Sequence, residues 1–153
     1  MPGFRQVMSV IVLSACTIAA PGQAQQADKE AIAAIFDKYV PYLNSANTDA
    51  ISTEIYSVPV LMPISGGRHV VLNTPQEFSK AWKSYLDNAA KNGLQNIALD
   101  SVDVSLVGPE AATAEVTYSS RVSTSATPVK NVWLYVLQKT AAGWRIVTLF
   151  QKS

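Results

Sequence analysis

The stretch from Asn131 to Gln151, NVWLYVLQKTAAGWRIVTLFQ, constrains the fold of this chain more than any other. Two runs rich in apolar and β-branched residues flank a short Ala-Ala-Gly segment, which predicts two strands joined by a turn. Successive side chains of a strand point to opposite sides of the sheet. The first strand is apolar on both sides, with Trp133, Tyr135 and Leu137 on one face and Val132, Leu134 and Val136 on the other. Each face therefore requires cover from other parts of the protein.

The length and charge of the chain narrow its class. A chain of 153 residues with 48% hydrophobic residues has the size and the apolar content of one globular domain. Lys and Arg total 12 and Asp and Glu total 11, so no net field attracts the protein to nucleic acid or to an anionic membrane. Nucleic acid is therefore not an expected partner.

Residues 1–24 have the pattern of a secretory signal peptide. Arg5 precedes a long apolar run, and Gly22 and Ala24 form a small-x-small cleavage pattern. The apolar run is shorter than the roughly 20 residues of a spanning helix. We expect cleavage after Ala24, which leaves residues 25–153 as one mature domain in the periplasm or outside the cell.

A second interpretation of the same segment stays open. The sequence LSAC, which ends at Cys16, resembles the lipobox of bacterial lipoproteins, in which the cysteine becomes the lipidated first residue. Only this alternative attaches the protein to a membrane. Cleavage after Ala24 would instead remove the single cysteine of the chain, so the mature domain would hold no disulfide and no cysteine ligand.

Helical periodicity dominates the next part of the chain. Apolar residues between Ile32 and Leu43 recur at helical spacing and predict an amphipathic helix of about five turns that Pro41 kinks or ends. Asn47 or Thr48 suits the N-cap of a second, shorter helix. Gly66-Gly67 predicts a small hairpin whose first run, with Pro59 and Pro63, is confined to a sheet edge.

A long capped helix follows and then the periodicity changes. Thr74 and Glu77 form a capping box, Pro75 occupies the first helical position and Gly93 suits the end of the helix. Its apolar face is formed by Phe78, Trp82, Tyr85, Leu86 and Ala89. Beyond Gly93 the pattern alternates, and short connections predict an antiparallel meander of four strands, 97–107, 111–123, 129–139 and 143–151.

This order of elements resembles the nuclear transport factor 2-like (NTF2-like) superfamily, which includes SnoaL-like polyketide cyclases and ketosteroid isomerases. The resemblance spans Ala27 to Gln151, and its specific parts are AIFDKYVPYLNSANTDAISTEIY and WLYVLQKTAAGWRIVTLFQ. It implies an α+β fold, a cone-shaped curved antiparallel sheet wrapped around three helices from the N-terminal half. It also implies an apolar pocket at the open end of the cone and a homodimer formed through the outer sheet face, which would cover the second face of the strands discussed first.

The resemblance further implies an Asp or His inside the cone of the catalytic members, commonly on the first strand after the second helix. Here that stretch is Val58–Pro63, VPVLMP, which holds no ionisable group. His69 is the single histidine and the weak candidate for an acid or base, since the pKa of histidine ordinarily lies near neutrality. With no mature cysteine and one histidine, we expect no metal site and no cofactor.

Aromatic residues are the remaining candidates for a site. Tyr and Trp combine apolar rings with a polar tip, which suits the wall of a binding pocket, although ordinary core packing is the alternative. Tyr118 stands among small residues on its strand face. The candidate ligand-binding residues are Tyr39, Tyr56, Trp82, Tyr118, Trp133 and Tyr135, with Tyr85 beside them.

The sequence favours an exported domain that binds a small apolar molecule and carries no evident catalytic set. Two alternatives stay open. One is a SnoaL-like or isomerase-like lyase or isomerase with a non-standard acid or base such as His69. The other is a non-catalytic dimeric module that acts through its sheet face.

Overall fold

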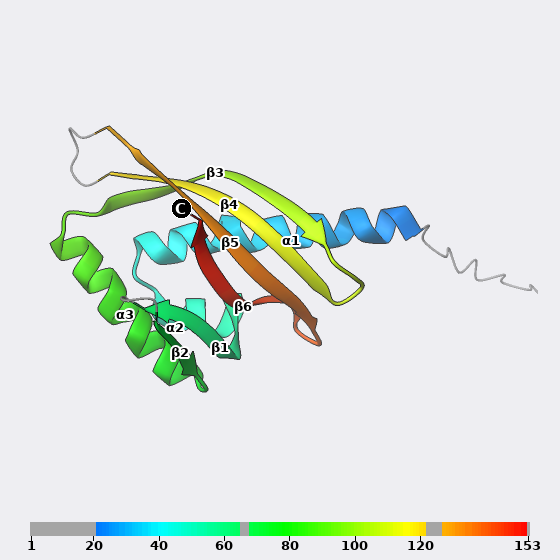
Figure 1. The fold of residues 1–153 in the computed structure, drawn as a ribbon, viewed down its shortest axis with the longest axis horizontal. Helices are drawn as coiled ribbons and strands as arrows, with labels where there is room; N and C mark the ends of the chain where they lie inside the picture. Colours follow the sequence, from blue (N-terminus) through cyan, green and yellow to red (C-terminus); the bar gives the residue numbers. More distant parts are fainter. Residues whose placement is uncertain (1–20, 65–67, 122–126, 153) are drawn as a thin grey trace, which may run out of the picture.

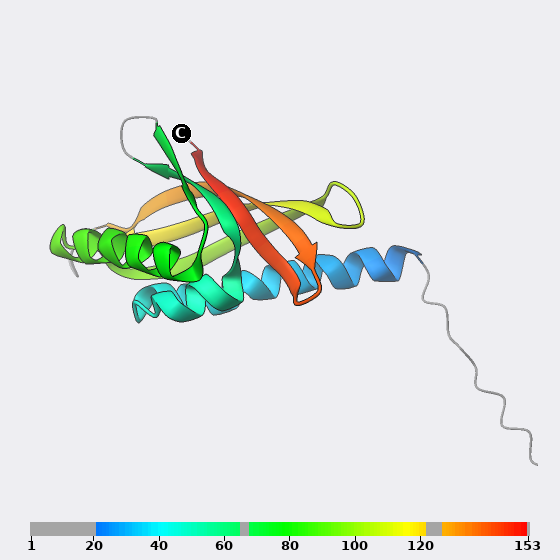
Figure 2. The same cartoon turned by 90° about the horizontal axis from the view of Figure 1, so that it is seen from below.

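The computed structural model describes residues 21–64, 68–121 and 127–152. Residues 1–20 of the predicted signal peptide, with Cys16, lie outside the described residues. So do Gly66 and Gly67 of the predicted hairpin turn. The helical segments lie on the concave side of one curved sheet (Figures 1 and 2). The elements are α1 Pro21–Asn44, α2 Thr48–Ala50, the π-helical turn η1 Ile51–Ile55, β1 Tyr56–Ile64, β2 Arg68–Leu72, α3 Pro75–Lys91, β3 Gln95–Leu106, β4 Ala111–Arg121, β5 Val129–Thr140 and β6 Gly143–Lys152.

The sheet has six strands in the order β2-β1-β6-β5-β4-β3. Adjacent strands pair antiparallel, except that β1 runs parallel to β6. The predicted α+β fold, the β1–β2 hairpin and the meander from β3 to β6 are confirmed. The sheet is mixed because β6, the last strand of the chain, lies in the middle of the sheet and pairs parallel with β1, the first strand.

The position of β1 differs from the prediction. Pro59 and Pro63 predict an edge strand, but β1 lies between β2 and β6, and β2 occupies the edge. Pairing with β6 is sparse, with an irregularity between Tyr56 and Leu61, the interval that holds Pro59. The missing N–H of Pro59 therefore falls in a gap of the ladder, where it breaks no regular pairing.

The helices are built as their sequence patterns require. Ile32, Phe36 and Tyr39 form the buried stripe of α1, and the helix continues past Pro41 to Asn44. At α3, Thr74 accepts a hydrogen bond from the Glu77 backbone N–H, and the Glu77 carboxylate accepts from the Thr74 N–H, which confirms the capping box. The short helix begins with an Asn47 cap, whose side chain accepts from the Ala50 N–H.

Polar side chains fix both ends of α1 to the sheet. Near the first end, Lys139 Nζ lies 2.6 Å and Trp144 Nε1 3.0 Å from the same oxygen of the Asp28 carboxylate, and both donate to it. At the other end, the Asn44 amide donates to the Ile97 carbonyl and accepts from the Ile97 N–H, each at 2.8 Å. The helix is therefore held along the concave side of the sheet at two separate points.

The two faces of β5 are separated as predicted. Tyr135 and Leu137 are buried on the concave side. On the convex side, Leu134 pairs with Glu115 of β4 and Phe150 of β6, and Phe150 remains 39% exposed. The concave side is a packed core, whereas the convex side retains apolar surface within the single chain.

Candidate ligand-binding pocket

A pocket of about 250 Å³ opens between α1, α3 and the concave side of the sheet. We call it the inner pocket. Its wall is predominantly aromatic and aliphatic, with three polar side chains from the strand ends. The lining residues are Tyr39, Leu43, Trp82, Tyr85, Leu86, Leu94, Ile97, Tyr118, Ser120, Asn131, Trp133, Tyr135, Leu149 and Gln151.

Four buried tyrosines from four elements form the floor of this region. Tyr118 Oη donates to Tyr135 Oη at 3.2 Å, and the hydroxyls of Tyr39 and Tyr56 lie 3.1 Å apart in a second hydrogen bond. The ring of Tyr135 also packs against Phe36, with centroids 5.0 Å apart. Helix α1 and strands β1, β4 and β5 thus bring together hydroxyl groups that are far apart in the sequence.

Burial raises the pKa of all four tyrosines above the ordinary value of 10.0, because desolvation disfavours the phenolate. Each hydroxyl therefore keeps its single proton. Tyr135 accepts from Tyr118, so its own proton has no acceptor among the described residues. In the Tyr39–Tyr56 pair, two hydroxyl protons share one hydrogen bond, so one of them likewise has no described acceptor. The floor offers hydrogen-bond donors to a ligand that carries an acceptor.

Trp82 adds to this excess of donors. Its Nε1 is buried and has no hydrogen-bond partner among the described residues. Buried polar groups are ordinarily paired, so an unpaired one near a pocket is a candidate contact for a ligand. Tyr85, which is half exposed, stacks on Trp82 with centroids 5.2 Å apart and forms part of the mouth.

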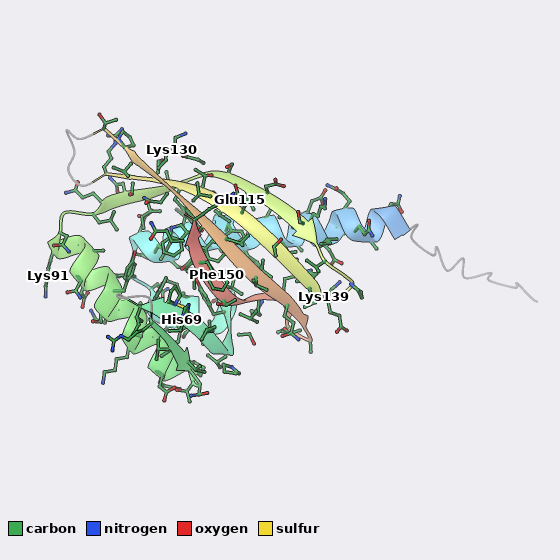
Figure 3. The ribbon with its side chains drawn as sticks, in the orientation of Figure 1. His69, Lys91, Glu115, Lys130, Lys139 and Phe150 are labelled. Atoms are coloured by element: carbon green, nitrogen blue, oxygen red, sulfur yellow. The ribbon has the colours of Figure 1, made fainter. Side chains whose placement is uncertain are left out.

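A second hollow of about 590 Å³, the outer groove, lies between the β1–β2 hairpin, α3 and the ends of β5 and β6. Its lining is Met62, Pro63, Ile64, Arg68, His69, Val70, Leu72, Ala81, Trp82, Tyr85, Trp133, Phe150 and Gln151. Figure 3 labels His69 on β2 and Phe150 on β6, whose rings are 6.5 Å apart. The weak catalytic candidate therefore lies in the groove, and the inner pocket is formed without it.

The ionisable residues of the two hollows are few. None of the described residues lining the inner pocket or the outer groove is Asp or Glu, so no carboxylate there orients His69. Within residues 21–64, 68–121 and 127–152, no cluster of three His, Cys, Asp or Glu side chains could hold a metal ion. The acids of β3 and β4 line neither hollow: Asp100 and Asp103 are exposed, and Glu115 accepts from Lys152 at 2.6 Å on the convex side.

Comparison with protein families identifies this architecture. The model of a family described as NTF2-like protein (DUF6841) matches residues 28–153. The chain belongs to this NTF2-like family. A comparison with curated protein sequences gave no match.

Solved structures share the fold of this NTF2-like domain at low identity. An NTF2-like protein with a cystatin-like fold from Novosphingobium aromaticivorans superposes with a TM-score of 0.70 at 18% identity, over 92% of this chain and 90% of that one. The association domain of C. elegans CaMKII superposes with a TM-score of 0.66 at 13% identity, over 86% and 99%. A putative calcium/calmodulin dependent protein kinase II association domain from Xanthomonas campestris gives 0.57 at 15%, over 95% and 96%.

Most of the residues selected from the sequence meet in the NTF2-like pocket. Tyr39, Trp82, Tyr118, Trp133 and Tyr135 line it, as does Tyr85. Tyr56 does not line the pocket and instead lies behind it, hydrogen bonded to Tyr39.

No helix among the described residues is long and apolar enough to cross a membrane.

The polar residues that line the inner pocket, Ser120, Asn131 and Gln151, are not among the candidates selected from the sequence. Asn131 shares the strand face of Trp133 and Tyr135 by simple alternation, so it could have been found. Gln151 is brought beside Trp133 by the β5–β6 register. Ser120, which follows Tyr118 by two residues, required the same alternation. Arg68 carried no signal of its own, because only the packing of the hairpin against α3 and β6 places it at a groove.

Proposed function

We propose that this NTF2-like domain is exported and binds a small, largely apolar molecule in the inner pocket. The observation that carries the proposal is an aromatic wall that ends in hydroxyl protons without described acceptors, above all that of Tyr135. Such a wall favours an apolar ligand with one hydrogen-bond acceptor, for example a carbonyl oxygen. Within the described lining no acid–base pair accompanies it, so the proposal is for binding without a reaction.

Calorimetric titration with two compounds of the same shape tests this directly. We expect 2-acetylnaphthalene to bind roughly fivefold more tightly than 2-isopropenylnaphthalene, in which CH₂ replaces the carbonyl oxygen, because one net hydrogen bond is worth about 1 kcal/mol. Tyr135→Phe should reduce that difference. Tyr42→Phe is the matched control, because the Tyr42 hydroxyl donates to Glu54 and is not among the pocket lining. If neither compound binds, the proposal fails.

Export is proposed from the composition of residues 1–24 and is tested separately. The protein is produced with its full N-terminus in a bacterial host, and the mass of the product is measured by native mass spectrometry. We expect a chain that begins at Gln25 in the periplasm or the medium. A lipidated chain that begins at Cys16 would support the lipoprotein alternative, and an uncleaved chain would contradict export.

A second proposal concerns self-association through the convex sheet face. Val132, Leu134 and Val136 lie on this face beside Phe150, and each of the three is only partly covered within one chain. Two of the structures with the same fold are described as association domains, which supports the proposal for this chain. A C₂ homodimer would cover the same patch on both subunits.

Leu134→Glu tests the homodimer by sedimentation velocity. A charge at the centre of an apolar interface should convert the dimer to a folded monomer, because the carboxylate would be buried unpaired. Val107→Glu is the control, since Val107 is 72% exposed in the β3–β4 connection. A wild-type monomer at all concentrations, or a dimer that survives Leu134→Glu, would contradict the proposal.

A further inference from the structure

The inner pocket and the outer groove border one another. Trp82, Tyr85, Trp133 and Gln151 line both hollows. Their boundary is aromatic, and Tyr85, the half-exposed member, stands at the mouth. A ligand longer than the inner pocket would therefore leave it along the groove, between α3 and the β1–β2 hairpin.

The groove differs from the pocket in charge. The described lining of the inner pocket contains no charged side chain, and the groove adds Arg68 as its one permanently charged residue. Arg68 forms no ion pair with any residue that the structure describes. The remaining wall of the groove is largely apolar, with Met62, Ile64 and Leu72 among its members. The complement of this surface is an apolar body with a single negative charge.

We propose that the ligand is an elongated organic monoanion, such as an aryl-alkanoate, whose apolar end fills the inner pocket and whose carboxylate meets Arg68. This inference rests on the proposed binding function and names its ligand class. A guanidinium presents paired N–H donors that match the two oxygens of a carboxylate.

Titration with 6-phenylhexanoate and 6-phenylhexan-1-ol tests the charge. The two probes share the ring and the chain and differ in the carboxylate. We expect the wild-type protein to bind the acid roughly tenfold more tightly than the alcohol, and Arg68→Gln to remove this preference without weakening the alcohol. Lys38→Gln is the control of equal charge change, because Lys38 is exposed on α1 and lines neither hollow. Melting curves establish that each variant is folded.

A shorter pair tests the length. Phenylacetate has a much shorter link between ring and carboxylate than 6-phenylhexanoate, so the proposal of an elongated ligand predicts no Arg68-dependent preference for it over 2-phenylethanol. The same preference for the short acid would overturn the elongated ligand. Equal affinity of the long acid and alcohol, or a preference that survives Arg68→Gln, would overturn the anion and leave the binding function intact. Failure of both long probes to bind would contradict the binding function itself.

Discussion

Two polar clusters lie between α1 and the sheet, and they differ in how their hydrogen-bond donors are matched by acceptors. Around Asp28, one carboxylate oxygen accepts hydrogen bonds from Lys139 and Trp144, and the Lys139 ammonium lies 5.6 Å from the centre of the Trp144 ring. Among the four buried tyrosines at and behind the pocket, each hydroxyl has one described hydrogen bond, and that partner is another tyrosine. The first cluster pairs a carboxylate with an ammonium and an indole N–H, whereas the second pairs hydroxyls with hydroxyls and leaves one proton of each pair without a described acceptor.

This difference separates a structural contact from a candidate binding contact. Lys139 lies near the end of β5 that reaches α1, and Lys130 near its other end (Figure 3). In the Asp28 cluster, Lys139 and Trp144 both donate to the carboxylate, so these contacts hold α1 in place. The tyrosine cluster keeps two protons over, which costs stability unless a further acceptor arrives. Unused hydrogen-bonding capacity beside a cavity is therefore the clearest sign of function in this molecule.

The largest effect is expected when the ring of Tyr135 is removed. Tyr135→Ala should lower the free energy of unfolding by about 3–5 kcal/mol, because it deletes a buried aromatic side chain and leaves a cavity against Phe36. Urea unfolding measures this loss. A loss below about 1 kcal/mol would show that the tyrosine cluster contributes no packing, and the comparison would have to be restated.

A smaller effect is expected at the other attachment point of α1. Asn44→Ala deletes two hydrogen bonds to the Ile97 backbone and should cost about 1–2 kcal/mol of unfolding free energy. Asn88→Ala on the exposed face of α3 is the control and should change stability by less than about 0.5 kcal/mol. Equal losses in both variants would indicate that the Asn44 contacts do not hold the helix.

Removal of the Tyr135 hydroxyl alone should have a smaller effect still on stability. Tyr135→Phe retains the ring but removes the hydroxyl that accepts from Tyr118, so we expect a loss of unfolding free energy of about 1 kcal/mol. The same variant is expected to show a reduced preference for a ketone ligand. A large destabilisation would instead assign the hydroxyl a structural role like that of Asp28.

The smallest effect concerns the pH dependence of the Asp28 cluster. Hydrogen bonds from Lys139, and then from Trp144, hold the pKa of the Asp28 carboxyl below its ordinary value of 3.8. A carboxyl with a depressed folded pKa contributes stability above the unfolded value and loses it as the pH falls through the folded value. The melting temperature of the wild type should therefore exceed that of Asp28→Asn at pH 7, and the difference should shrink below about pH 4. A pH-independent difference would contradict this origin.

The local elements could be predicted because their signals are local. The capping box at Thr74, the Asn47 cap and the alternation of β3 to β6 depend on neighbours within a few residues, and all are present in the structure. The edge position predicted for β1 was wrong for the converse reason. Two prolines report only that their own N–H groups are missing, and the sequence near them does not reveal that β6 pairs across that gap, where Tyr56 is the partner of Ile146 and Leu61 of Thr148.

The sequence by itself determined the α+β fold, the buried stripe of each helix and the aromatic residues that serve as candidates for a pocket, because periodicity and side-chain type decide which faces are buried. Only the tertiary structure decided which hydroxyls pair, that Tyr56 lies behind the wall, and that Arg68 lines the groove next to the pocket. These relations join residues from β1, β2, α1, β4 and β5, and they depend on sheet register and helix placement. Such long-range geometry leaves no pattern in any single stretch of the chain.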